Sequence, residues 1–271
     1  MRRAAAGGGA WGARAAGLAA LAVVAALAAL GGLARGEQVQ QGNLIVSLDG
    51  GISPRGLPRD RPAPAAVSLS GRLRTADGSP LPRLGGIELA LAGRGLLFTR
   101  GLPLCPRQRL RNATGAQALE RCAGALVGHG RLRAEVFVPH QAPFAVHARL
   151  LAFNGRARGG GVAVWVHAFS AKPPVSFVLP FVVRHRPGAF GTALRASLPR
   201  SIGPWPHLTS FEMTFGRRYR YRGAFRSYLS ASCPLPPRFT AGLFPFARAT
   251  YTFAGKRRLA TTIVRGCRAR D

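Results

Sequence analysis

Short runs of alternating apolar and polar residues recur along the chain and predict β-strands. The clearest run is 67–73, Val-Ser-Leu-Ser-Gly-Arg-Leu, in which every second residue is apolar or small. A period of two is typical of a strand with one buried face. We expect further strands at 43–48, 87–91, 96–99, 132–138, 144–153, 162–169, 175–185, 191–198, 208–215, 218–222, 225–232, 243–253 and 259–264.

This set of about a dozen short strands, separated by turn residues, favours an all-β fold, either a β-sandwich or a jelly-roll-like arrangement. The clearest hairpin pairs 144–153 with 162–169, through a turn at 154–161 that begins with Asn-Gly and ends with three glycines. One short helix is expected at 115–122, because Thr114 can cap its first turn.

The first 36 residues have the composition of a targeting segment. Three arginines stand near the start, and an Ala-rich apolar run follows at 15–30, ahead of small residues up to Gly36. This layout is typical of a secretory signal peptide, so we expect a protein that is secreted or held in the cell envelope. The alternative is that 1–36 stays attached as an N-terminal membrane anchor, since the apolar run is nearly long enough to span.

The rest of the chain divides by composition. Residues 37–65 predict a short strand followed by a tether rich in Pro and Arg, and 66–271 predict a β-rich domain. Two lobes with a boundary near 100–140 are an alternative to one domain.

Four cysteines, Cys105, Cys122, Cys233 and Cys267, allow three pairings, and the sequence does not choose among them. We expect nearest neighbours to pair, Cys105 with Cys122 and Cys233 with Cys267. An even number of cysteines in an exported chain favours disulfides over a metal site. We interpret the glycine-rich stretch 101–130 as an architectural staple, in which the first disulfide closes the short helix.

Several short sequence motifs include these cysteines or lie between them along the chain. They are Gly101-Leu102-Pro103-x-Cys105, Cys122, Val127-Gly128-x-Gly130, Phe153-Asn154-Gly155, the run Ser-Tyr-Leu-Ser-Ala-Ser-Cys-Pro at 227–234, and Cys267. With this set, roughly residues 66–267 resemble an uncharacterised group of exported proteins from high-GC soil bacteria. The resemblance implies a β-rich exported protein with two disulfides. It implies no activity, so it transfers no functional residue.

The charge of the chain is strongly positive. It has 39 Lys and Arg against nine Asp and Glu, a formal net charge of +30, and all but two of the basic residues are arginine. Such a charge favours anionic partners, and we consider anionic cell-wall polymer, polysaccharide or lipid headgroups. Codon bias in a GC-rich genome is an alternative explanation for arginine in place of lysine, but it does not explain the shortage of acids. We expect membrane contact only through the N-terminal segment, if that segment is uncleaved.

The basic run at 217–222 is the sharpest candidate for binding. In a strand, Arg218, Arg220 and Arg222 would project to one face, and Tyr219 and Tyr221 to the other. The three arginines are our predicted ligand-binding residues. Because the tyrosines would point away from them, base stacking is disfavoured and nucleic acid is not the expected partner. The alternative is a solvated arginine face above a buried tyrosine face.

Histidines offer one candidate metal site. His147 and His167 lie in the two strands of the predicted hairpin, and they face each other if partner positions sum to 314. Such a pair could bind a metal ion. The alternative is that both are strand histidines on the solvent side or beside tyrosines and arginines.

The sequence contains no G-x-S-x-G, S-x-x-K or H-E-x-x-H motif. The few acids are expected in other roles: Asp49 and Asp77 in Asp-Gly turns, and Glu88, Glu135 and Glu212 as partners of surplus arginines. We therefore predict a non-enzymatic protein with no catalytic residue and no cofactor. An envelope hydrolase or metal-dependent enzyme using the strand histidines, and a purely structural domain, are the alternatives.

Overall fold

A computed structural model of the chain describes residues 37–93, 95–198 and 206–270. Contacts divide the chain into two units, Met1–Arg35 and Gly36–Asp271, and every described residue belongs to the second. The predicted signal peptide, 1–36, lies outside the described residues. Within the described ranges, every helix is too short or too polar to cross a lipid bilayer.

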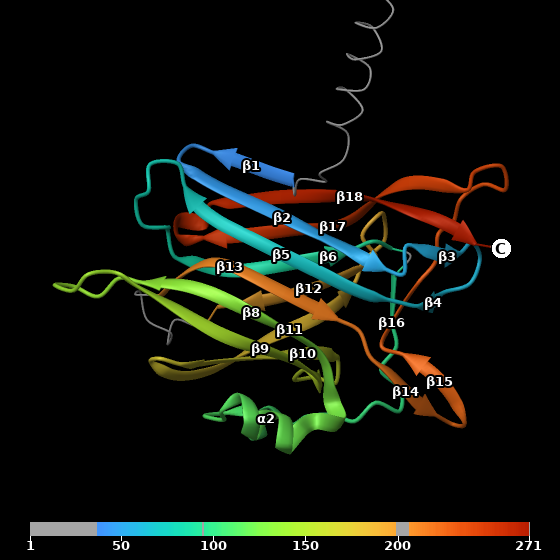
Figure 1. Cartoon of the computed structure of the whole chain (residues 1–271), viewed down its shortest axis with the longest axis horizontal. Coiled ribbons are helices and arrows are strands. Elements are labelled where there is room, and N and C mark those ends of the chain that lie inside the picture. Colours follow the sequence, from blue (N-terminus) through green and yellow to red (C-terminus); the bar gives the residue numbers. More distant parts are fainter. Residues whose placement is uncertain (1–36, 94, 199–205, 271) are drawn as a thin grey trace, which may run out of the picture. The chain divides into compact units, whose positions relative to one another are not determined.

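Strands dominate the described residues (Figure 1). The strands are β1 (Glu37–Gln41), β2 (Leu44–Ser53), β3 (Gly56–Pro58), β4 (Ala63–Pro64), β5 (Ala66–Thr75), β6 (Leu84–Leu91), β7 (Gly95–Leu97), β8 (Leu126–Val136), β9 (Phe144–Arg156), β10 (Val162–Ala171), β11 (Pro174–His185), β12 (Thr192–Ser197), β13 (Pro206–Phe215), β14 (Arg218–Tyr221), β15 (Ala224–Ser227), β16 (Leu229–Ala231), β17 (Ala241–Phe253) and β18 (Arg258–Arg270). The helices are α2 (Gly115–Cys122) and the 3-10 helices η1 (Arg107–Leu110), η2 (Ala123–Ala125) and η4 (Ala254–Lys256). The expected all-β class with one short α-helix is confirmed.

Thirteen of the described strands form one hydrogen-bonded sheet, in the order β1-β2-β5-β13-β8-β9-β10-β11-β12-β6-β17-β18-β3. The sheet curls, so that β18 lies against β1 and β2 although it is not paired with them (Figure 1). The Thr261 hydroxyl of β18 donates to the carbonyl oxygen of Glu37 in β1 at 3.1 Å. The Val264 amide donates to the carboxylate of the same Glu37 at 3.2 Å.

The largest of three apolar clusters among the described residues lies between the facing halves of this sheet. On β2, Leu44, Val46 and Leu48 are almost fully buried, as their alternation predicts. From the opposite half, Tyr251 of β17 reaches across to β5, where a Cβ at Gly71 would lie 2.8 Å from the tyrosine hydroxyl oxygen. The two layers expected of a sandwich are therefore formed by one continuous sheet.

Residues 37–65 contain four strands, β1 to β4, where a short strand followed by a tether was expected. Strand β2 pairs with β5 along its whole length, from Leu44 to Ser53. The Pro- and Arg-rich stretch after it forms β3 and β4, which pair with β18 and β16. Proline is tolerated there because both short strands lie at sheet edges.

Strand β8 pairs with both β13 and β9 inside one unit, so no boundary near 100–140 separates two lobes.

The segment 105–125, hereafter the knuckle, is the main helical feature. Helix α2 begins after Thr114, whose hydroxyl accepts from the Gln117 amide at 3.2 Å. The Gln117 side chain accepts from the Thr114 amide at 2.9 Å. This reciprocal capping box satisfies two donors that the first turn leaves without partners, and it confirms the start predicted from the sequence.

Both disulfides pair nearest neighbours, Cys105 with Cys122 and Cys233 with Cys267, which confirms the expected pairing. The first closes the knuckle, and the second ties the chain after β16 to β18. Disulfides of this kind are typical of proteins in an oxidising, extracytoplasmic compartment.

The remaining described strands form two small sheets, β14-β15 and β4-β16-β7. The single strand expected at 225–232 is broken at Tyr228, whose side chain is 1% exposed and enters the core. Its amide donates to the carbonyl oxygen of Arg217 at 2.8 Å, so the chain turns there from one small sheet to the other.

Candidate anion-binding site

The β9–β10 hairpin positions a buried tryptophan on the outer face of the sheet. Its register places Trp165 opposite Phe153 and Ala163 opposite Gly155. Gly155 leaves room for the indole, since a Cβ there would lie 2.6 Å from Cδ1 and Cε2 of Trp165. Asn154 and Gly155 are therefore strand residues, and the turn that the sequence placed at 154–161 begins only after β9 ends at Arg156.

The knuckle is fixed to this hairpin by polar contacts to its backbone. The Trp165 indole Nε1 donates to the carbonyl oxygen of Cys105 at 3.0 Å. The Cys105 amide donates to the carbonyl oxygen of Asn154 at 2.9 Å, and the Asn154 side-chain amide donates to Pro103 at 3.1 Å and to Leu102 at 3.4 Å. These bonds run from β9 and β10 to the chain that enters the knuckle.

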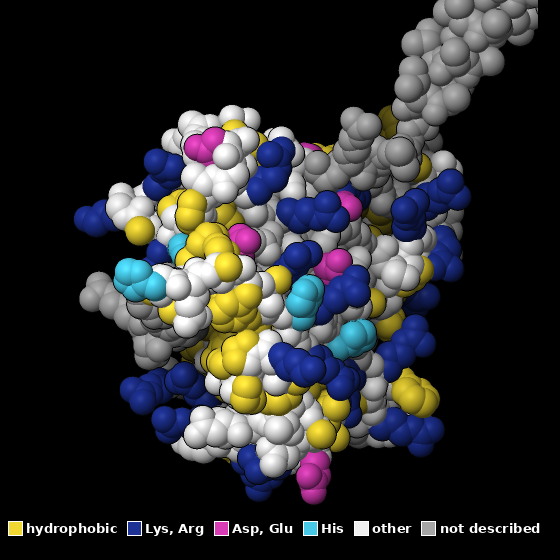
Figure 2. Space-filling view, turned by 60° about the vertical axis from the view of Figure 1, so that its left-hand side comes forward, with side chains coloured by type: hydrophobic (Ala, Val, Ile, Leu, Met, Phe, Trp, Pro, Cys, Tyr) yellow, Lys and Arg dark blue, Asp and Glu magenta, His cyan; other side chains and the backbone are white. Residues whose placement is uncertain are grey.

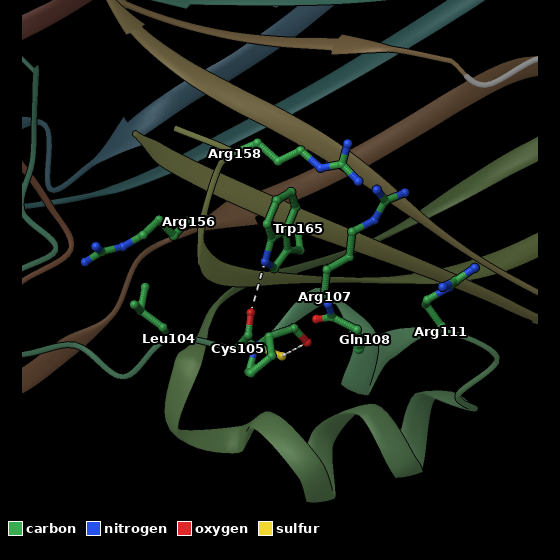
Figure 3. A pocket seen from close by; sticks show the side chains of 9 residues that line it. Leu104, Cys105, Arg107, Gln108, Arg111, Arg156, Arg158 and Trp165 are labelled. Carbon is green, nitrogen blue, oxygen red and sulfur yellow. Dashed lines mark hydrogen bonds between the residues drawn. The ribbon is translucent and has the colours of Figure 1, made fainter. Parts of the chain in front are cut away.

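The knuckle and the end of the hairpin enclose a hollow of about 560 Å³, hereafter the cationic cleft. Arg107 and Arg111 line it from the knuckle side, and Arg156 and Arg158 from the hairpin side. Figure 3 shows Arg107 and Arg158 extending toward one another beside the Trp165 ring, with Arg156 and Arg111 on opposite sides. Four cationic side chains from two distant parts of the sequence thus line one hollow.

Among the described residues, no carboxylate lines the cleft and no ion pair involves its four arginines. Guanidinium groups that converge without a counter-ion repel each other. An anionic group between Arg107 and Arg158 would relieve this repulsion. It could also accept paired hydrogen bonds, because the guanidinium fork matches carboxylate and phosphate oxygens.

The cleft lining carries no side chain suited to acid–base or nucleophilic chemistry. Besides the arginines it consists of Leu104, Cys105, Pro106, Gln108 and Trp165. The sulfur of Cys105 is held in a disulfide and cannot act as a thiolate. The arrangement therefore suits the binding of an anion.

The described acids lie in other environments. Glu88, Glu212 and Asp77 do so as the sequence predicted, whereas Asp49 lies within strand β2 and not in the predicted Asp-Gly turn. Glu88 pairs with Arg186 at 3.0 Å, Glu212 pairs with Arg131 at 2.7 Å, and Asp49 pairs with Arg265. Asp77 stabilises its turn, because hydrogen bonds from the Ser79 amide, the Ser79 hydroxyl and the Asn43 side chain lower its pKa to about 2. These carboxylates are thus engaged in ion pairs and a turn.

The two strand histidines do not face each other, so the expected metal pair is wrong. His167 lies opposite Leu151 of β9, and His147 lies opposite Arg133 of β8. The register differs by four residues from the one that would pair them, which separates their positions along the strand by about 13 Å. The cause is the turn, which comes later than predicted. Among the described residues, no group of three or more His, Cys, Asp or Glu could hold a metal ion.

His167 has a structural position instead. Its side chain is fully buried beneath the knuckle, and its Nε2 lies 2.9 Å from the carbonyl oxygen of Ala113 and 3.2 Å from the Ser176 hydroxyl. Its Nδ1 has no partner among the described residues. Desolvation lowers the pKa of His167, and the hydrogen bond to Ala113 partly offsets this effect. A neutral His167, with its proton on Nε2, therefore holds the knuckle to β10.

The predicted arginine strand forms as β14. Arg218 and Arg220 are exposed, while Tyr219 and Tyr221 are half-buried, as alternation predicts. Arg222 differs from the prediction, because it lies in the turn after β14, with a positive φ of 51°, and not on the strand face. Its guanidinium lies over the Tyr221 ring, 5.4 Å from the centroid.

Basic side chains are also widespread outside these two places. Figure 2 shows one face of the molecule on which dark blue Lys and Arg groups are scattered over most of the surface and acidic groups are few. Charge alone therefore does not mark a site on this protein. What distinguishes the cationic cleft is that four arginines line one hollow, two of them extending toward one another, and that no carboxylate is among its described lining residues.

The four cleft arginines were not predicted as site residues. The sequence did contain a signal: Arg156 and Arg158 alternate at the end of a strand, and Arg107 and Arg111 lie beside the first cysteine of the knuckle. The stretch 101–130, which we interpreted as purely architectural, supplies one wall of the cleft as well as the staple.

Comparison of the chain with protein-family models, with curated proteins and with solved structures finds no match.

Proposed function

We propose that this chain is an exported, non-enzymatic binding protein that holds anionic polymers, with the cationic cleft as its principal site. One observation carries the proposal: Arg107, Arg111, Arg156 and Arg158 line a single hollow whose lining contains no carboxylate. Arranging like charges in this way costs free energy in the folded protein, and a bound anion recovers it.

Export to the cell envelope or the extracellular space is part of the same proposal. The layout of 1–36 supports it, and so do two disulfides with no free cysteine among the described residues. A protein in those compartments would meet anionic wall polymers and polysaccharides, which are the partners we propose. The separation of His147 from His167 argues against the alternative in which these two histidines bind a metal ion together.

The proposal is tested by the binding of a short sulfated oligosaccharide to the full chain, measured by calorimetry. The double variant R107Q/R158Q removes the two converging guanidiniums and keeps polar side chains of similar length. We expect its affinity to fall by about tenfold or more, because each lost charge-assisted contact contributes about 1.5–3 kcal/mol.

The matched control is R72Q/R74Q, which removes the same charge from exposed positions on β5. Affinity in this control should fall by less than about twofold at physiological salt, since distant exposed charges are screened. Equal losses in the two variants would show that binding follows net charge and would overturn the cleft as the site. No binding by the wild type would favour a purely structural domain.

A further inference from the structure

The β14–β15 hairpin presents a second group of arginines, and its position is fixed by tyrosines. The Tyr219 hydroxyl donates to the carbonyl oxygens of Phe98 at 3.1 Å and Arg100 at 2.9 Å. Burial raises the pKa of Tyr219, with a smaller opposing effect from Arg226, so the phenol keeps its proton as a donor. The Tyr221 ring lies against Gly101, where any Cβ would collide with it.

The hairpin contacts the chain segment that leads into the cationic cleft. Phe98 to Gly101 contact the hairpin, while Leu102, Pro103 and Cys105 are hydrogen-bonded to β9 and β10. From Arg100 to Cys105 the backbone can extend over at most about 18 Å. The hairpin and the edge of the cleft are therefore neighbours.

A second tether holds the hairpin to the knuckle. The Arg217 guanidinium, immediately before β14, donates to the carbonyl oxygens of Ala123 and Leu126 at 2.8 Å each. The hairpin is thus anchored to the chain before the knuckle, at Phe98 and Arg100, and to the chain at the end of the knuckle, at Ala123 and Leu126. None of its arginines belongs to an ion pair between described residues.

From this arrangement we infer that one extended ligand binds the cationic cleft and the β14–β15 hairpin together, and that the ligand is a linear anionic polysaccharide. The inference rests on the proposed function of the cleft and adds the hairpin as a second subsite. A chain long enough to reach both subsites binds the second at high effective concentration, so its affinity exceeds that of a short chain.

The aromatic rings in the hairpin and beside it argue against nucleic acid as the ligand. Arg220 lies over Phe225 at 4.8 Å, Arg222 over Tyr221 at 5.4 Å and Arg226 over Phe98 at 5.6 Å. A guanidinium already covers one face of each ring, and single-stranded nucleic acids rely on free aromatic faces for stacking. The guanidinium edges remain available to the charged groups of a polysaccharide.

The experiment measures the affinity of the full chain for heparin oligosaccharides of increasing length. We expect a rise of about tenfold or more once the oligosaccharide is longer than about 20 Å, slightly more than the longest possible span of the backbone between Arg100 and Cys105. The variant R218Q/R220Q/R222Q should abolish this rise and leave the affinity for short oligosaccharides within about twofold of the wild type. R72Q/R74Q is the control, and its affinity should rise with oligosaccharide length as that of the wild type does.

The outcomes separate the two proposals. Suppose that short oligosaccharides bind, that R107Q/R158Q lowers their affinity, and that affinity does not depend on length. The cleft is then still the binding site, and the second subsite is wrong. A length effect that survives in R218Q/R220Q/R222Q also overturns the hairpin as the subsite. The chain should bind long heparin more strongly than single-stranded DNA of equal charge or vesicles of anionic lipid. If one of these binds more strongly, the polysaccharide is the wrong ligand class.

Discussion

The indole nitrogen of Trp165 donates a 3.0 Å hydrogen bond to the carbonyl oxygen of Cys105, the residue whose sulfur closes the knuckle. This bond joins the hairpin that carries Arg156 and Arg158 to the segment that carries Arg107. Both residues are almost fully buried, at 7% and 2% exposure. This buried bond between a side chain and the backbone is therefore one of the contacts that set the relative position of the two walls of the cationic cleft.

Replacing Trp165 with Phe removes the donor and leaves the Cys105 carbonyl oxygen buried without it. A buried polar group that loses its partner costs about 1–3 kcal/mol. We expect the free energy of unfolding of W165F, measured by urea denaturation, to fall by about this amount. Its affinity for a short sulfated oligosaccharide should fall as well, because the arginines of the two walls lose their fixed separation. An unfolding midpoint equal to that of the wild type would contradict this role of the bond.

Local patterns predicted the strands and the helix because these depend on neighbours in the sequence. The alternation at 67–73 lies within β5, and the Thr114 cap marks the start of α2. The cleft could not be predicted in this way, since Arg107 and Arg158 meet only through the docking of the knuckle on β10. The hairpin register was also beyond local reasoning, because Gly155 continues the strand to accommodate the Trp165 ring instead of starting the turn.

The fit between Gly155 and Trp165 leads to a prediction about packing. In G155A the new methyl group would lie 2.6 Å from the indole carbons, closer than carbon atoms approach, so the ring must move. Overpacking of this kind costs about 1–3 kcal/mol. We expect that loss in urea denaturation, together with weaker oligosaccharide binding. The control is G161A in the turn of the same hairpin, where no atom lies within 4 Å of the added Cβ; its stability should change by less than about 0.5 kcal/mol.

Removal of the two disulfides, one at a time, should have different effects on stability and on binding. Cys105 and Cys122 are 17 residues apart and Cys233 and Cys267 are 34 apart, so on the loop-entropy model they contribute about 3 and about 4 kcal/mol. We expect C105A/C122A to lose both stability and oligosaccharide affinity, because the released knuckle carries Arg107 and Arg111. C233A/C267A should lose as much stability or more and keep its affinity. Equal affinity in both variants would mean that the knuckle does not form the binding site.

Burial of His167 predicts a dependence of stability on pH. Desolvation lowers its pKa in the folded protein below the ordinary value of 6.5, while the unfolded chain keeps that value. Above pH 6.5 the residue is neutral in both states and stability is unaffected. As the pH falls below 6.5 the unfolded state takes up a proton that the folded state does not, so stability is lost down to the folded pKa and is constant below it.

This loss is checked by urea denaturation of the wild type and H167Q between pH 7.5 and pH 5, conditions chosen to bracket a pKa of about 6.5. Around the imidazole, the carbonyl oxygen of Ala113 and the Ser176 hydroxyl are the polar groups within hydrogen-bond distance, and neither titrates in this range. H167Q should be less stable at pH 7.5 and should show a shallower decline toward pH 5. H147Q, at an exposed position on β9, should follow the wild-type decline. If H167Q and the wild type decline in parallel, another group is responsible for the pH dependence.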